Sequence, residues 1–81
     1  MHIYMSRFNM TQSVFEAKKR KAVTTEIYEA VMNISANISH PNRDFIEKHV
    51  FPRGYPQEFR DEIERLWREI DQDGLLAEYP A

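Results

Sequence analysis

The sharpest chemical feature of this 81-residue sequence is a run of four cations, Lys18, Lys19, Arg20 and Lys21. Adjacent cations release counterions from phosphates, so such a run is a candidate for nonspecific binding of nucleic acid. A short run is more typical of a solvated helix end, or of a basic surface that meets an acidic protein. The run therefore predicts an electrostatic contact, with a protein as the preferred partner and nucleic acid as the alternative.

Acidic side chains gather at the other end of the chain, where the last thirty residues hold eight acids and four arginines. Glu62, Glu64 and Glu69 belong to this group, and we interpret them as candidates for binding a partner. Their charge could steer the chain toward a basic target, or imitate the surface of a nucleic acid. Carboxylates without a pocket that shifts their pKa do not predict acid–base catalysis.

The sequence holds no strong signature of a metal site or a catalytic centre. There is no cysteine, and His2, His40 and His49 share no spacing that is typical of a metal site. Two glycines are too few for a glycine-rich loop that binds phosphate. We therefore expect no enzymatic activity, no metal and no cofactor.

The strongest structural prediction is an amphipathic helix over residues 56–73. Helical spacing puts five apolar residues of this segment in one stripe: Phe59, Ile63, Leu66, Trp67 and Ile70. Charged residues occupy the remaining circumference. Pro56 suits the first helical position, and Gly74 suits the residue that ends the helix. The stripe is therefore expected to face a core.

A second amphipathic helix is predicted over residues 24–38. Its apolar stripe is equally narrow and comprises Val23, Ile27, Ala30, Val31, Ile34 and Ile38. We expect the stripes of the two helices to close against each other. Tyr28 and Met32 lie on the opposite side of this helix, and apolar residues on both sides usually indicate two neighbours. We interpret this pair as contacts with another subunit or a protein partner, with packing inside the chain as the alternative.

The remaining residues predict two shorter elements. One helix begins near Pro41 and ends before Pro52, and another begins at Ser13. Residues 1–12 are expected to form an N-terminal arm or a short strand, which leaves residues 13–81 as a single helical domain. The predicted fold class is therefore mainly α, a small bundle of three to four helices with a short N-terminal strand as an option.

One local resemblance bears on the nucleic-acid alternative. "AVTTEIYEAVM", residues 22–32, resembles the start of the second helix in ribbon-helix-helix repressors of the Arc type. "HIYMSRF", from His2, would then stand for their ribbon strand. The resemblance implies that alternate residues of the strand face the DNA groove, either Tyr4, Ser6 and Phe8 or Ile3, Met5 and Arg7. It also implies that Thr24 or Thr25 caps the helix at a phosphate. The first helix of that fold would have to fit between Ser13 and Lys21, which makes it shorter than the first helix of the family usually is.

The cellular setting and the function follow from these features as expectations. No segment is apolar over the roughly 18 residues of a membrane helix, and the N-terminus lacks the apolar region of a signal peptide. We expect a cytoplasmic protein that binds a protein partner and forms a homodimer. The first hypothesis is a small regulatory or inhibitory protein of the kind that bacteria, phages and mobile elements encode. The alternative is a DNA-binding transcriptional regulator or antitoxin with a basic N-terminal and an acidic C-terminal part.

Overall fold

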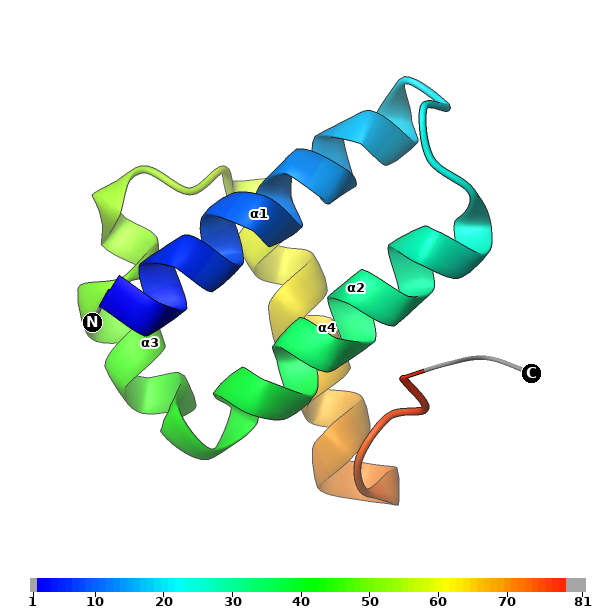
Figure 1. Cartoon of the computed structure of the whole chain (residues 1–81). Helices are drawn as coiled ribbons and strands as arrows, with labels where there is room; N and C mark the ends of the chain where they lie inside the picture. The colour runs from blue at the N-terminus through cyan, green and yellow to red at the C-terminus, as the bar shows by residue number, and fades with distance from the viewer. Residues whose placement is uncertain (1, 79–81) are drawn as a thin grey trace.

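Four α-helices and two short 3-10 turns build the chain, seen here in a computed structural model that describes residues 2–78 (Figure 1). The helices are α1 (His2–Lys19), α2 (Thr25–Ser39), α3 (Arg43–His49) and α4 (Gln57–Asp73). The 3-10 turns, His40–Asn42 and Phe51–Arg53, flank α3. The mainly-α prediction is confirmed. Over the described residues the chain forms no strand, so the optional N-terminal strand is not formed.

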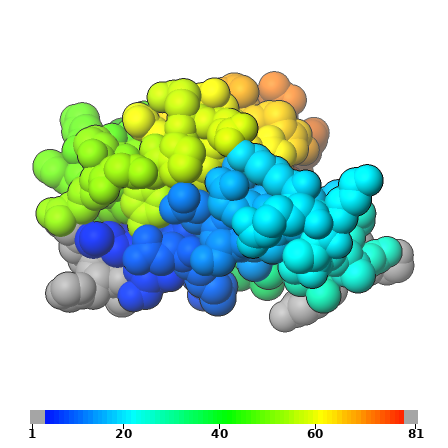
Figure 2. All heavy atoms as spheres, turned by 90° about the horizontal axis from the view of Figure 1, so that it is seen from above, coloured from blue at the N-terminus to red at the C-terminus, as the bar shows by residue number. Residues whose placement is uncertain are grey.

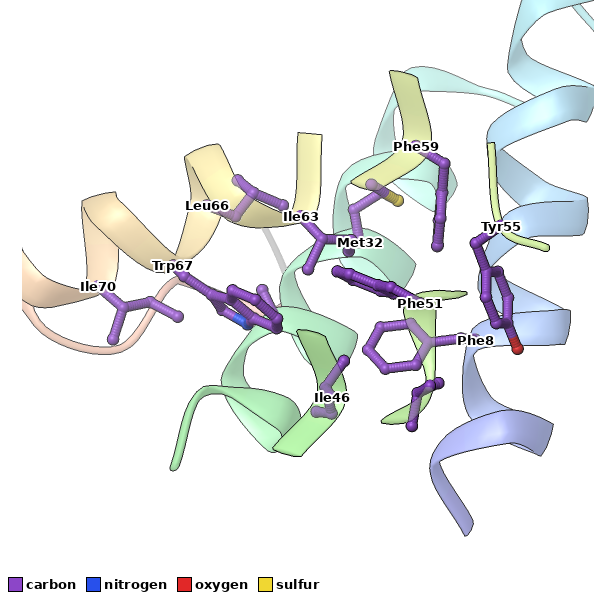
Figure 3. Packing of buried hydrophobic residues seen from close by; sticks show 12 residues of the cluster. Phe8, Met32, Ile46, Phe51, Tyr55, Phe59, Ile63, Leu66, Trp67 and Ile70 are labelled. Carbon is purple, nitrogen blue, oxygen red and sulfur yellow. The ribbon is translucent and has the colours of Figure 1, made fainter. Parts of the chain in front are cut away.

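The core lies between the α1–α2 pair and α4. α1 and α2 are neighbours that run in opposite directions, and α4 crosses behind them (Figure 1). Aromatic rings from three parts of the chain meet in this space (Figure 3). The ring of Phe8 from α1 lies 5.4 Å from that of Phe51 and 6.1 Å from that of Phe59, both edge to face. This arrangement is a favoured one for aromatic pairs, and it joins α1 to α4.

α1 corrects the prediction for the N-terminal residues. Instead of an arm over residues 1–12 and a helix from Ser13, one continuous helix covers both segments of the described chain. Phe8 and Thr11 are fully buried on its inner face, so the predicted boundary falls inside a helix that belongs to the core. Because Thr11 is polar, it interrupts the apolar spacing that would otherwise indicate a helix over this segment. The hydroxyl of Thr11 lies 2.6 Å from that of Ser35, which satisfies it inside the fold.

α2 begins and ends close to the predicted residues, but it turns the opposite face toward the core. Its buried residues are Met32, Ser35, Ala36, Asn37 and Ser39. The apolar stripe faces outward, and Ile27 and Ile38 are 52% and 42% exposed. The prediction that the stripes of α2 and α4 close against each other is therefore wrong. Small side chains line most of the inner face because they fit beside the bulky side chains of α1 and α4.

α4 confirms the strongest prediction in its bounds and in its buried face. Its buried residues are Phe59, Ile63, Leu66, Trp67 and Ile70. Burying large side chains of this kind stabilises a fold by about 1.5–3 kcal/mol each. Pro56 precedes the helix in extended backbone, and Gly74 ends it with a φ of +85°, a value that glycine adopts readily.

A chain of buried hydroxyl groups links three helices through the core. The Thr11 and Ser35 hydroxyls join α1 to α2. Ser39 Oγ donates to the Ser35 carbonyl at 2.6 Å and accepts from Trp67 Nε1 at 3.0 Å, which joins α2 to α4. Buried polar groups are costly when they lack a partner. These bonds therefore help to determine which face of α2 turns inward.

We expect Ser39→Ala to lower the free energy of unfolding by about 1–3 kcal/mol, because the Trp67 indole N–H would lose its buried acceptor. Urea unfolding followed by circular dichroism measures the change. Ser13→Ala is the matched control, since Ser13 donates to the carbonyl four residues earlier, as Ser39 does, but is exposed. Equal losses in the two variants would contradict a specific role for the bond between Trp67 and Ser39.

Candidate functional site

The outer face of α2 is a row of aliphatic side chains at the surface: Ile27, Ala30, Val31, Ile34 and Ile38. The two end residues are exposed and the three between them are half-buried. The row contains no charged residue. Exposed apolar residues that belong to one row mark a candidate contact surface more strongly than residues scattered singly. This face is therefore the candidate site for contact with another macromolecule.

Tyr28 and Met32, which the sequence suggested as partner contacts, lie elsewhere. Met32 is 2% exposed inside the core, so the prediction that it contacts a partner is wrong (Figure 3). Tyr28 is half-buried, with its ring 6.5 Å from that of Phe15. Burial raises the pKa of the Tyr28 hydroxyl, and the charge of nearby Glu62 acts in the same direction. Both residues belong to the inward-facing side because α2 is turned about its axis relative to the prediction.

The cationic run passes from the end of α1 into the loop before α2, at one end of the molecule (Figure 2). Lys18 and Lys19 occupy the last turn of α1, where positive charge complements the helix dipole. The Lys18 ammonium lies 5.9 Å from the centre of the Tyr28 ring. Lys19 forms an ion pair with Glu58 of α4, and this hydrogen bond raises the pKa of Lys19. Two of the four cations therefore contact other parts of the chain.

Arg20 and Lys21 are exposed and follow the end of α1. Arg20 lines a shallow groove of about 430 Å³ along α1, together with Asn9, Gln12, Ser13 and Glu16. The one hydroxyl of the lining, that of Ser13, donates to the Asn9 carbonyl. Lys18 and Lys19 thus contact different neighbours within the chain, whereas Arg20 and Lys21 are exposed beside them.

The three acidic candidates of α4 also separate into two groups. Glu62 and Glu69 flank Arg65, which forms ion pairs with both. The hydrogen bond to Glu62 raises the pKa of Arg65. Glu64 takes no part in this network, and its pKa is raised by burial and then by the nearby charge of Glu47. Arg65 therefore offsets one of the two negative charges that Glu62 and Glu69 carry.

A contact that the sequence analysis missed joins α2 to the segment after α4. The chain turns back at Gly74 toward α2 (Figure 1). Asn37 Nδ2 donates to the Leu76 carbonyl and Asn37 Oδ1 accepts from the Leu76 N–H, each at 2.9 Å. Asn33 Nδ2 donates to the Ala77 carbonyl at 2.7 Å. We call Asn33 and Asn37 the asparagine clamp. Their spacing of four residues is a signal in the sequence, but it does not indicate what they bind.

A polar link fixes the C-terminal half of α4 to the turn after α2. His40 Nε2 lies 2.7 Å from Asp71 Oδ1, and Arg43 Nη2 lies 3.8 Å from the same oxygen. The hydrogen bond from His40 lowers the pKa of Asp71, and the charge of Arg43 adds to this effect. A carboxyl group whose pKa is lowered by folding stabilises the fold above its unfolded pKa. This stabilisation is lost as the pH falls through the lowered pKa.

In the described part of the chain, no three histidine, aspartate or glutamate side chains form a group that could hold a metal ion. Across residues 2–78, none of the helices combines the length and the apolar character needed to span a lipid bilayer.

Comparisons with family models, curated proteins and solved structures gave no match to this chain. Fold and surface thus define a class, a small all-α bundle with an exposed aliphatic helix face.

Proposed function

We propose that this chain is a non-enzymatic regulatory protein that acts by binding protein, and that the outer face of α2 binds a second copy of the chain. The exposure of Ile27 and Ile38 carries the proposal. Removing apolar area from water stabilises a contact by roughly 25 cal/mol per Å². A row of aliphatic side chains that the chain itself leaves at the surface therefore favours association with a similar row.

The pattern of the outer face favours a second copy as the occupant. Ile27, Val31, Ile34 and Ile38 follow each other at intervals of four, three and four residues, the spacing by which paired helices interlock. An aliphatic row is complementary to another aliphatic row, as a two-fold interface requires.

The same surface favours protein over nucleic acid as the partner. Its side chains carry no charge, whereas contacts with phosphates depend on exposed cations. Lys18 and Lys19 contact Tyr28 and Glu58 of the same chain, which leaves Arg20 and Lys21 as the free end of the run. The segment that would be the DNA-reading strand of a ribbon-helix-helix protein forms the start of α1. The DNA-binding alternative therefore has less support.

We expect the wild-type chain to sediment as a dimer. Ile27→Asp combined with Ile38→Asp should weaken this dimer by about a hundredfold or more, because each copy would place unpaired carboxylates in an apolar contact. Both side chains are exposed, so the substitutions should leave the fold of the single chain intact. Analytical ultracentrifugation over a dilution series measures the dissociation constant of each protein.

Leu75→Asp is the matched control for this experiment. Leu75 is 73% exposed in the segment after α4, so its replacement adds one carboxylate per copy outside the outer face of α2, where the double variant adds two within it. Circular dichroism confirms that each variant is folded. A wild-type chain that stays monomeric at every concentration, or a dimer that persists with both substitutions, would contradict the proposal.

A further inference from the structure

The asparagine clamp holds its segment through main-chain atoms. Asn37 bonds both the N–H and the C=O of Leu76. A carboxamide can do this because it carries a donor and an acceptor side by side. Asn33 lies one turn earlier on α2 and bonds the carbonyl of Ala77. Main-chain bonds of this kind supply affinity for an extended backbone whatever its side chains.

Residues 75–78, which the clamp holds, are called the docked segment. Two of its side chains add selectivity to the main-chain bonds. Leu76 is half-buried and packs against the hydrophobic core, whereas the adjacent Leu75 points largely into solvent. Glu78 Oε2 lies 3.1 Å from Asn37 Nδ2 and accepts a further hydrogen bond. The docked segment therefore indicates what kind of peptide the asparagine clamp can bind. It is a peptide with an aliphatic residue that is followed two positions later by an acid.

The docked segment is tethered to the rest of the fold by a residue that is suited to a change of direction. Gly74 has a φ of +85°, and no atom lies within 4 Å of the place where a side chain would begin. Beyond Gly74, the described segment meets the clamp through four hydrogen bonds and one half-buried aliphatic side chain. A short tether gives such a segment an effective concentration on the order of mM at its site. A segment of another protein displaces it only when its affinity for the clamp or its concentration outweighs this advantage.

We propose that the asparagine clamp is a binding site for a peptide segment of another protein. The segment carries an aliphatic residue in the place of Leu76 and an acid in the place of Glu78. Residues 75–78 of the chain occupy the site as a built-in competitor and leave it when the partner's segment binds. The clamp lies beside the outer face of α2 but does not use its aliphatic side chains, so the proposal does not depend on the dimer.

Fluorescence anisotropy with a labelled peptide of residues 73–81, "DGLLAEYPA", tests this site in the full-length chain. We expect the Leu76→Ser chain to bind the peptide at least about tenfold more tightly than the wild-type chain, because its own segment competes less well. Asn37→Ala in the Leu76→Ser chain should abolish binding. The matched control peptide, which carries Leu76→Ser itself, should not bind either variant.

A folded Leu76→Ser chain that does not bind the peptide would overturn the proposal, as would equal binding after Asn37→Ala. Adding Ile27→Asp and Ile38→Asp to the Leu76→Ser chain should leave peptide binding unchanged, which separates this result from the fate of the proposed dimer. Sedimentation provides one further outcome. A wild-type dimer that Leu76→Ser converts to a monomer would assign the clamp to the segment of a second copy, and would overturn its assignment to another protein.

Discussion

Phe8→Ala is expected to lower the free energy of unfolding by about 3–5 kcal/mol, the usual range for removing a buried aromatic ring. Phe8 is fully buried, and its ring lies within 6.2 Å of the rings of Phe51, Tyr55 and Phe59 (Figure 3). The substitution removes the ring that all three contact and leaves a cavity between α1 and α4. A domain of this size has only a few kcal/mol of net stability, so we expect most of the variant to be unfolded.

Urea unfolding followed by circular dichroism measures this effect, and Met10→Ala provides the control. Met10 lies on the same helix but is 49% exposed, so its replacement should change the free energy of unfolding by no more than about 0.5 kcal/mol. A Phe8→Ala protein as stable as the Met10→Ala protein would contradict the placement of α1 in the core. It would return residues 1–12 to the role of a peripheral arm.

α4 could be predicted from the sequence because every local signal agrees there. Its apolar stripe is complete, and the polar residues fill the rest of the circumference. Pro56 and Gly74 mark its ends. α1 could not be predicted in the same way, because Thr11 interrupts the apolar pattern between Phe8 and Phe15. Its hydroxyl is acceptable in a core because it donates to the Arg7 carbonyl one turn earlier and also bonds Ser35, which is 24 residues away in the sequence.

The apolar periodicity of α2 predicts the helix but not which of its faces meets the core. The stripe from Ile27 to Ile38 and the cap at Thr24 predict a helix and its bounds, and both predictions are close to the structure. Periodicity groups residues on one face but does not say whether that face meets the core of the same chain. The buried face carries Ser35 and Ser39, whose hydroxyls become acceptable only when partners from other helices and carbonyls bond them. The partners Thr11 and Trp67 come from other helices and are a tertiary property, whereas the carbonyl that Ser39 bonds lies four residues earlier in α2.

The candidate site was missed for the same reason. An aliphatic row is normally assigned to the core, so Ile27 and Ile38 became candidates for partner contact only when the structure placed them at the surface. The asparagine clamp depends on the return of the chain after Gly74, which brings Leu76 next to residues that lie 39 positions earlier. Charge runs were visible in the sequence, but their partners across the fold were not.

Ala36→Asp and Ile38→Asp form a pair that tests the orientation of α2 directly. Ala36 is fully buried, so an aspartate in its place would be an unpaired charge in an apolar site and should lower the free energy of unfolding by about 3–5 kcal/mol. Ile38 is 42% exposed, so the same aspartate there can remain in water and should lower this free energy by less than about 1 kcal/mol.

Because the two positions are two residues apart on one helix, both variants add the same charge at nearly the same place in the sequence and differ mainly in the face that carries it. Urea unfolding should be measured at a protein concentration where both variants are monomeric, so that a dimer does not contribute to the difference. The order predicted from the apolar stripe alone is the reverse, with Ile38 in the core. A larger loss for Ile38→Asp than for Ala36→Asp would therefore contradict the observed orientation, and with it the exposed face on which the proposed dimer depends.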